Sequence, residues 1–318
     1  MKVVALAGGV GGAKLADGLA RVLRPDELTI IVNTGDDFSH FGLRICPDLD
    51  TVCYTLAGIA NQQTGWGRND ETWNVMEHLR EIGAPIWFNL GDRDLATHLE
   101  RTRRLALGEK LSEVTRFFCS LWGIKCAVLP MTDDRMETWV ETREEGWIPF
   151  QEYFVLHRCE LKVKGFEFRG REKARPAPGV IDAIREAEHI IVCPSNPWVS
   201  ITPILEVPGV MEEIAGGESV RIAISPIIQG KTVKGPAAKM YEEMGIQPSA
   251  TAVASHYSSW IHGFVMDVLD QKEMDVVRET GVAVLLTDTL MTEIEKRVEL
   301  ARAVLEFSKK LSREKLKL

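Results

Sequence analysis

The sequence predicts an α/β protein with a mostly parallel, doubly wound sheet that helices cover on both faces. Short apolar segments typical of buried strands alternate with helical patterns along most of the chain. The first of these segments runs directly into a glycine-rich turn and then a helix, as in doubly wound proteins. No repeat, low-complexity tract or flexible linker interrupts this alternation. These observations favour one large α/β unit.

The predicted strands are short runs of β-branched and aliphatic residues, and the predicted helices repeat apolar residues every three or four positions. In the first helix this spacing joins Leu15, Leu19 and Leu23. We expect strands at Val3–Leu6, Leu28–Val32, Pro85–Asn89, Lys125–Leu129, His189–Cys193, Val220–Ile224, Gly263–Val268 and Val282–Leu286, and later helices at Thr51–Ala60, Val180–Ala187, Ala237–Met244 and near Thr292–Lys310.

Two stretches depart from the alternation. Residues Leu95–Trp122 have a helical pattern throughout, which suggests an inserted helical subdomain (95–122) in a core made of 1–94 and 123–318. Near 138–168 the segments TWVET, FQEYFVLH and CELKVKGFEF resemble short antiparallel strands.

The composition narrows the classes of function. The 318 residues are 45% hydrophobic and 26% charged, and the formal net charge of −8 argues against a general nucleic-acid or membrane-surface binder. No apolar run reaches the ~18 residues of a membrane span, and no signal-like segment is evident, so we expect a cytoplasmic protein. The six cysteines form no CxxC pair, which favours reduced, buried thiols over a zinc site.

The glycine-rich turn AGGVGGAK, Ala7–Lys14, is a candidate phosphate-binding loop. Glycines between a strand and a helix let backbone N–H groups approach an anion at the positive end of the helix. The turn departs from the Walker A pattern, because Leu15 follows Lys14, and from the dinucleotide fingerprint, because Lys14 replaces a small residue. A tight turn without a ligand remains an alternative. The candidate binding residues are Gly9, Val10, Gly11, Gly12 and Lys14.

Polar residues gather where the predicted strands end. In open parallel sheets ligands bind beyond the carboxyl ends of the strands. Any one of these segments could be ordinary turn chemistry, but five at the same edge favour a shared site. The segments are Thr34–Asp37, Gly91–Asp94, Pro194–Pro197, Ser225–Ile228 and Asp288–Thr289.

Two further segments carry reactive groups. At the start of the predicted helix after Pro47, Asp48 is a candidate N-cap, and Asp50 could complement the helix dipole. Asp50 could equally hold Mg²⁺ or accept a hydroxyl proton. The second segment contains the strip Arg93, His98, Arg101 and Arg104, which suits either a salt-bridged helix face or a diphosphate.

Eight motifs in series resemble the CofD family, the 2-phospho-L-lactate transferases of coenzyme F420 biosynthesis. The resemblance extends from residue 4 to about residue 291 and leans toward the branch that includes actinobacterial members. The motifs are GGVGGAK, VNTGDD, CPDLDT, LGDRDLATH, LPMTDD, PSNPWVSI, SPIIQGKTVKGPA and TDTLM.

The resemblance implies an Mg²⁺-dependent transfer without a covalent enzyme intermediate. The acceptor would be the ribityl 5′-hydroxyl of Fo, 7,8-didemethyl-8-hydroxy-5-deazariboflavin. The donor would be a guanosine diphosphate ester, lactyl-2-diphospho-5′-guanosine or its enolpyruvyl or glyceryl counterpart, and GMP would leave. The family also suggests a homodimer. The identity of the small acid stays open at this point.

The resemblance also implies roles for individual residues. The glycine loop and Lys14 would hold the diphosphate. Asp50 and Arg93 match family positions that contact Fo, and Trp66 or Trp73 could stack on its ring system. Polar groups from the strand ends, Asn33, Asp36, Asp37, Ser195, Asn196 and Ser225, would complete the nucleotide site.

Two other classes compete with this interpretation. Related CofD-like proteins serve as regulatory nucleotide binders and share the glycine loop. The LGDRDLATH and CPDLDT segments favour the transferases, which use these positions for the acceptor. An NAD(P) dehydrogenase is disfavoured, because the second predicted strand ends in Asn33 instead of the acidic residue that would bind a ribose.

Overall fold

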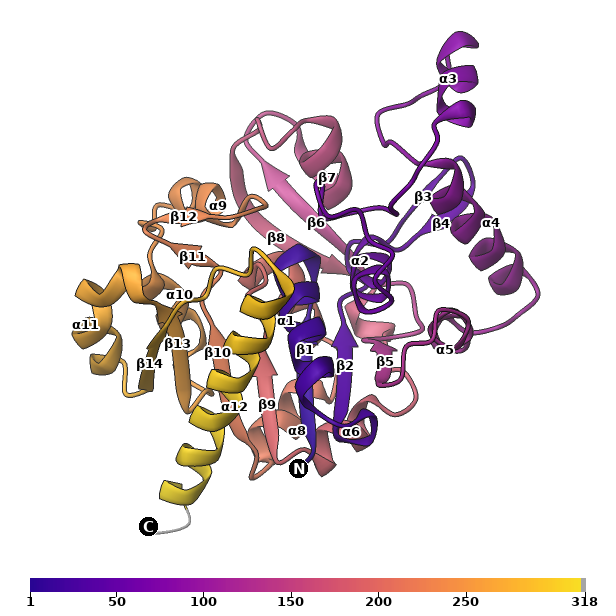
Figure 1. Cartoon of the computed structure of the whole chain (residues 1–318). Coiled ribbons are helices and arrows are strands. Elements are labelled where there is room, and N and C mark those ends of the chain that lie inside the picture. Colours follow the sequence, from indigo (N-terminus) through magenta and orange to yellow (C-terminus); the bar gives the residue numbers. More distant parts are fainter. Residues whose placement is uncertain (316–318) are drawn as a thin grey trace.

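The computed structural model describes residues 1–315 and contains a seven-stranded, all-parallel sheet between two layers of helices (Figure 1). The strand order is β14-β13-β10-β9-β1-β2-β5, so the first strand of the chain lies inside the sheet. The α/β prediction is confirmed. The strands are β1 (Val3–Ala7), β2 (Leu28–Val32), β5 (Ala127–Pro130), β9 (His189–Val192), β10 (Val220–Ile224), β13 (Gly263–Asp267) and β14 (Ala283–Thr287).

Strand β1 shows why these segments are continuously apolar. It pairs in parallel with β2 and β9, with Val3 opposite both Leu28 and His189. Successive side chains of a strand point to opposite faces, and here helices cover both faces. Accordingly, Val3 belongs to the hydrophobic cluster on one face, and Val4 and Leu6 to the cluster on the other.

One face of the sheet is covered by helices from both ends of the chain. Helix α1 (Gly9–Val22) packs against α2 (Pro47–Leu56) and against the final helix, α12 (Ile294–Lys315). Leu15 and Leu19 of α1 and Val304 of α12 are buried in this cluster. The predicted helices are confirmed here, although α2 begins four residues before the predicted start.

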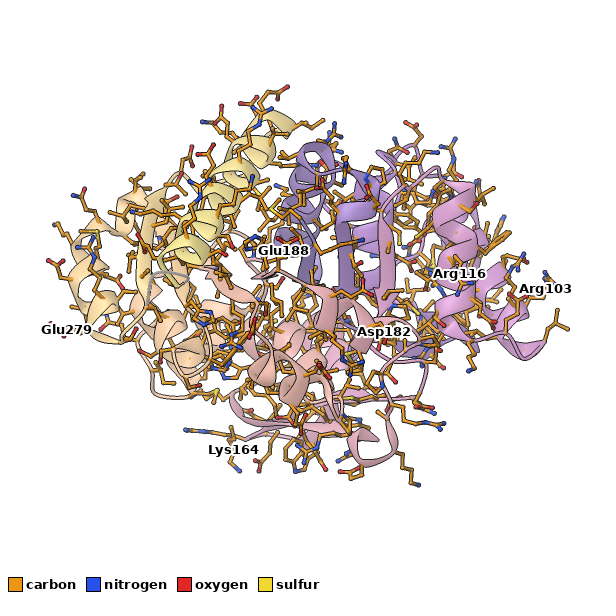
Figure 2. The ribbon with its side chains drawn as sticks, turned by 90° about the horizontal axis from the view of Figure 1, so that it is seen from below. Arg103, Arg116, Lys164, Asp182, Glu188 and Glu279 are labelled. Carbon is orange, nitrogen blue, oxygen red and sulfur yellow. The ribbon has the colours of Figure 1, made fainter. Side chains whose placement is uncertain are left out.

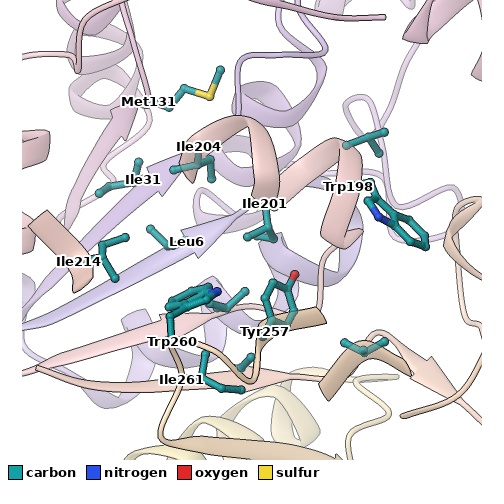
Figure 3. Packing of buried hydrophobic residues seen from close by; sticks show 14 of the residues in the cluster. Leu6, Ile31, Met131, Trp198, Ile201, Ile204, Ile214, Tyr257, Trp260 and Ile261 are labelled. Atoms are coloured by element: carbon teal, nitrogen blue, oxygen red, sulfur yellow. The ribbon is translucent and has the colours of Figure 1, made fainter. Parts of the chain in front are cut away.

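The opposite face carries shorter helices. The cluster there joins Leu6 and Ile31 of the sheet to Ile204, Tyr257 and Trp260 (Figure 3). The helices involved are α6 (Val180–Glu186), α7 (Thr202–Leu205), α8 (Val210–Gly216), α9 (Ala237–Glu243), α10 (Ala250–Tyr257) and α11 (Met274–Glu279).

The strand predicted at Pro85–Asn89 is wrong, because residues 85–89 form an irregular loop after α3 (Asn74–Glu81). The apolar side chains of this loop pack on a small hairpin instead of the sheet. Phe88 lies edge-on to Phe38, with ring centroids 4.8 Å apart. The hairpin consists of β3 (Phe38–His40) and β4 (Leu43–Ile45).

The helical pattern of Leu95–Trp122 contains two helices, α4 (Asp92–Ala106) and α5 (Leu111–Leu121). Helix α5 packs against β5, and its Leu111 and Cys119 belong to the cluster that contains β1. The division into a core and an inserted subdomain stays a prediction.

An antiparallel three-stranded sheet occupies the other irregular stretch. It has the order β7-β6-β8, from β6 (Glu137–Thr142), β7 (Gly146–Pro149) and β8 (Val163–Arg169). The strand predicted at FQEYFVLH is wrong, because a π-helix, η2, spans Glu152–Leu156. A helical turn brings Phe150 over Phe154, with ring centroids 5.5 Å apart and planes within 6°, and buries Tyr153.

Short helical turns and strands connect these layers. Charged side chains such as Arg103, Lys164 and Glu279 lie at the periphery of the molecule (Figure 2). No helix within residues 1–315 is long and apolar enough to cross a membrane. All six cysteines are free thiols; five of them are buried, as predicted, whereas Cys159 is partly exposed. The connecting elements are η1 (Pro25–Glu27), η3 (Arg171–Lys173), η4 (Pro197–Ile201), η5 (Val268–Glu273), β11 (Ile227–Ile228) and β12 (Lys231–Thr232).

Candidate functional site

A cavity of about 560 Å³ lies at the carboxyl end of the sheet, where the glycine-rich turn meets the first turns of α2 and α4. The loop 61–67 and the segment after β12 also contribute to its wall. Among the predicted residues, the lining includes Gly9, Val10, Gly11, Asp36, Asp50, Ser195 and Asn196. Four of the five predicted polar segments contribute to this lining, although Gly91–Asp94 follows a loop instead of a strand, and Asp288–Thr289 lies outside it.

The glycines of the turn allow close approach of neighbouring backbone. Gly9 has a φ of +61°, which side-chain-bearing residues rarely adopt. A Cβ on Gly11 would lie 2.2 Å from the carbonyl oxygen of Pro194, and one on Gly12 would lie 2.6 Å from Oγ of Ser195. The turn is thus pressed against the loop that follows β9, and the Gly8 N–H donates to Ser195 Oγ at 3.2 Å.

Lys14 is turned away from the cavity. Its Nζ donates to the carbonyl oxygen of Met291 at 2.8 Å. Burial, followed by the charges of Arg297 and Lys234, lowers the pKa of Lys14. The lysine that sequence reasoning assigned to the phosphates therefore ties α1 to the loop before α12.

One buried amide joins two carboxylates beside the glycine turn. Nδ2 of Asn33 donates to Asp36 Oδ1 at 2.7 Å and to Asp48 Oδ2 at 2.9 Å. Burial raises the pKa of Asp48 to about 6 and, together with the charge of Asp48, raises that of Asp36. Asp48 also accepts the Gly9 N–H at 2.7 Å, and Cys46 occupies the N-cap position that the sequence suggested for Asp48.

Several predicted residues shape this edge from behind the lining. Asp37 is buried against Arg44, with Nη2 3.1 Å from Oδ2, and burial raises its pKa to about 6. The Ser225 hydroxyl donates to the Ile227 carbonyl at 2.8 Å. Asn33, Asp37 and Ser225 therefore hold the edge in place, while Asp36, Ser195 and Asn196 face the cavity.

The other end of the cavity is built around Asp50. Arg101 binds both carboxylate oxygens of Asp50, with Nη1 3.0 Å from Oδ2. The same Nη1 lies 3.0 Å from Nδ1 of His98, whose Nε2 lies 3.4 Å from Asp94 Oδ1. Tyr54 donates to Asp94 at 2.7 Å. These side chains are all buried.

Protonation in this group follows from its contacts. Burial raises the pKa of Asp50 in spite of Arg101. Burial also acts to raise the pKa of Asp94, but the nearby His98, the hydrogen bond from Tyr54 and the charge of Arg101 outweigh it and lower that pKa overall. Because Arg101 can only donate, His98 Nδ1 must accept, and in neutral His98 the proton resides on Nε2.

Two sets of groups could hold a cation. The ligand atoms of Asp50, Asp94 and His98 lie within 4.8 Å of one another. In that set Arg101 already binds the carboxylate of Asp50. His98 carries its proton on Nε2, so this nitrogen donates a hydrogen bond instead of binding a metal. Asp36 and Asp48 have carboxylate oxygens next to the cavity with an amide as their shared partner. Hard carboxylate oxygens suit Mg²⁺, and Asp36 and Asp48 are freer to bind it.

The remaining predicted residues, Arg93, Trp66 and Trp73, lie at or beyond the rim of the cavity. Arg93 is half exposed and lies 3.7 Å from Asp70, through Nη1 and Oδ2. Trp66 lines the cavity, whereas Trp73 lines a separate shallow hollow with Met76 and Arg80.

Sequence reasoning missed other residues of the lining. Tyr54 and Lys234 line the cavity, as do Phe150 and Phe154. Lys234 stands in the SPIIQGKTVKGPA motif, but no local pattern showed where its side chain points. Phe150 and Phe154 were assigned to a strand, which concealed their shared face.

A glycine turn and a group of carboxylates at the carboxyl edge of a doubly wound sheet define a Rossmann-like α/β protein suited to a phosphorylated ligand. A family model described as 2-phospho-L-lactate transferase CofD matches residues 3–303, and the chain belongs to the CofD family. It is thus a transferase of coenzyme F420 biosynthesis, as the motifs indicated.

Relatives named phosphoenolpyruvate transferase match almost the whole chain. The protein from Kitasatospora aureofaciens is 45% identical over 311 residues, covering 96% of this chain and 97% of its own. The protein from Thermobifida fusca is 42% identical over 324 residues, with 98% and 99% covered.

A crystal structure of a UPF0052 family protein from Bacillus halodurans is similar in fold. The TM-score is 0.63 and the identity 15%, with 96% of this chain and 98% of the other covered. The similarity extends along the chain and supports the Rossmann-like assignment.

Proposed function

We propose that this protein transfers a phosphoenolpyruvyl group from enolpyruvyl-diphosphoguanosine to the ribityl 5′-hydroxyl of Fo. The choice of enolpyruvate over lactate or glycerate follows the names of the relatives. The observation that carries the proposal is one cavity of about 560 Å³ that joins the glycine turn to the Asp50 group. A diphosphate ester and a hydroxyl acceptor could meet in such a cavity.

The proposed reaction is a single displacement. The hydroxyl oxygen of Fo forms a bond to the phosphorus that carries enolpyruvate, and the bond from that phosphorus to the bridging oxygen breaks. GMP leaves with the bridging oxygen, and the hydroxyl proton passes to a carboxylate. Asp50 is the candidate, because Arg101 fixes its orientation at the cavity wall.

The proposal includes Mg²⁺, held by the carboxylates of Asp36 and Asp48, with Asp50 as a further candidate ligand. Four lining carboxylates, Asp36, Asp48, Asp50 and Asp94, would otherwise repel an anionic donor. A bound Mg²⁺ would neutralise charge on the diphosphate and on the departing GMP. Asn33 keeps Asp36 and Asp48 together for this purpose.

The decisive experiment offers the enzyme Fo, Mg²⁺ and each of the three guanosine diphospho-donors, and weighs the products by mass spectrometry. We expect the enolpyruvyl product to form fastest, with GMP in equal amount. Product from none of the donors contradicts the transferase proposal. The regulatory alternative would then gain support if the protein also failed to shift the fluorescence of Fo.

A variant tests the role of Asp50. We expect Asp50→Asn to lower kcat about 100-fold or more, the scale of losing one well-placed catalytic group. Asp182→Asn is the matched control, because Asp182 is an exposed acid on α6. Near-wild-type turnover of Asp50→Asn with saturating Fo and Mg²⁺ rules out a central role.

The proposal also places the protein in the cytoplasm as a homodimer, following the family resemblance. Light scattering of the purified chain tests the dimer, for which a mass near twice 35.5 kDa is expected.

A further inference from the structure

The cavity has a marked imbalance of charge. Its lining includes four aspartates but, within residues 1–315, a single lysine or arginine side chain, Lys234. The donor in the proposed function carries a diphosphate, so a positive side chain close to the glycine turn would stabilise it in addition to Mg²⁺. Lys14 is not part of this lining, because its side chain is turned toward the carbonyl of Met291.

Lys234 is close to the glycine turn. A Cβ on Gly65 would lie 2.8 Å from Nζ of Lys234 and 2.9 Å from Cγ1 of Val10. The ammonium group and the side chain of Val10 therefore meet at the same backbone position of the 61–67 loop. Because Val10 is the second residue of α1, this position lies at the positive end of that helix.

The present partners of Lys234 are neutral. Its Nζ donates to the backbone carbonyls of Gln63 and Thr64. Lys234 is itself exposed, so its ammonium group is available to solutes. An ammonium group forms stronger hydrogen bonds with phosphate oxygens than with neutral carbonyls. A phosphate at the glycine turn would therefore compete effectively for Lys234.

We propose that Lys234 binds the diphosphate of the donor at the glycine turn, a role that the sequence had suggested for Lys14. This inference rests on the proposed function, because it takes the donor to be a guanosine diphosphate ester. It assigns the outer phosphate to Lys234 from one side and to the glycine turn from the other. Mg²⁺ held by Asp36 and Asp48 would then bind the same diphosphate on the side of these two carboxylates.

Calorimetric titration of the full chain with GDP and with GMP, both with Mg²⁺, tests this assignment. We expect Lys234→Gln to weaken GDP binding about 10- to 100-fold, as expected for a lost hydrogen bond to a charged group. GMP binding should change much less, because GMP lacks the outer phosphate. Lys234→Arg should retain most of the GDP affinity.

Lys231→Gln is the matched control, since Lys231 is an exposed lysine three residues earlier on β12. It should bind GDP like the wild type, and circular dichroism should show all variants folded. Unchanged GDP affinity in Lys234→Gln, or an equal loss for GDP and GMP, overturns the assignment but leaves the proposed function intact. Failure of the wild-type protein to bind GDP overturns both.

Discussion

The two ends of the cavity are built in different ways. At the acidic end, Asp50, Asp94, His98 and Arg101 come from α2 and α4, and their side chains are buried and bonded to one another. At the other end, the buried Asp36 and Asp48 lie behind the glycine backbone, while the 61–67 loop and the exposed Lys234 form the outer wall. Folding therefore preorganises the first end, whereas the outer wall of the second, with Lys234, depends on a ligand for its final contacts.

The physical cause is the cost of burying charge. A buried carboxylate is stable only with a partner, so the acidic end has to be completed when the chain folds. Backbone N–H groups and an exposed ammonium group carry no such requirement. Substitutions at the acidic end should therefore affect stability first, and substitutions at the glycine end should affect ligand binding first.

The largest effect on stability is expected from Arg101→Met. This change leaves Asp50 buried without its cation, and should lower the free energy of unfolding by about 3–5 kcal/mol. Urea denaturation followed by circular dichroism measures the loss. Adding Asp50→Leu to the same chain should restore most of it, since no unpaired charge remains. A loss below about 1 kcal/mol for the single variant would contradict a preorganised acidic end.

Gly11→Ala should have an intermediate effect. The new Cβ would lie 2.2 Å from the Pro194 carbonyl, a backbone atom that cannot move alone. We expect a loss of about 1–3 kcal/mol and weaker GDP binding, because the turn has to shift. Gly216→Ala, at a position where a Cβ meets nothing within 4 Å, is the control. Equal GDP affinity in both variants would show that the glycine turn does not contact the ligand.

The smallest effect on stability is expected from Arg93→Ala. Arg93 is half exposed, and its side-chain ion pair is with the exposed Asp70. The free energy of unfolding should change by less than about 0.5 kcal/mol, while affinity for Fo falls. Thermal melting and Fo fluorescence titration measure the two quantities. A stability loss comparable to that of Arg101→Met would mean that the preorganised region reaches further than Asp50.

The sequence correctly predicts features that depend on residues close together in the chain. Buried strands such as Val220–Ile224 and the polar ends of strands follow from local patterns. The strand predicted at Pro85–Asn89 failed because its apolar residues pack on a hairpin, and a local pattern does not reveal the packing partner. Similarly, Phe150 and Phe154 are four positions apart, a spacing that places both on one face of a strand and also on one face of a helical turn.

The same limit applied within the site. Asp50 and the glycine turn could be found from residue type and position. The lysine that we propose for the diphosphate could not be found in this way. Lys14 and Lys234 both stand in motifs shared with the family, and they differ only in the direction of their side chains. Arg101 was one of several arginines on a helix until the fold brought it to Asp50, 51 positions away in the chain.

The position of β1 within the sheet sets an order for assembly during synthesis on the ribosome. Val3 pairs with His189, and the glycine turn needs Ser195 to accept the Gly8 N–H. The first strand therefore waits for most of the polypeptide before its second edge is covered. Such distant pairing slows folding and leaves an apolar strand open to other chains in the meantime. The amino-terminal glycine turn, although made first, gains these contacts only after residue 195 has been synthesised.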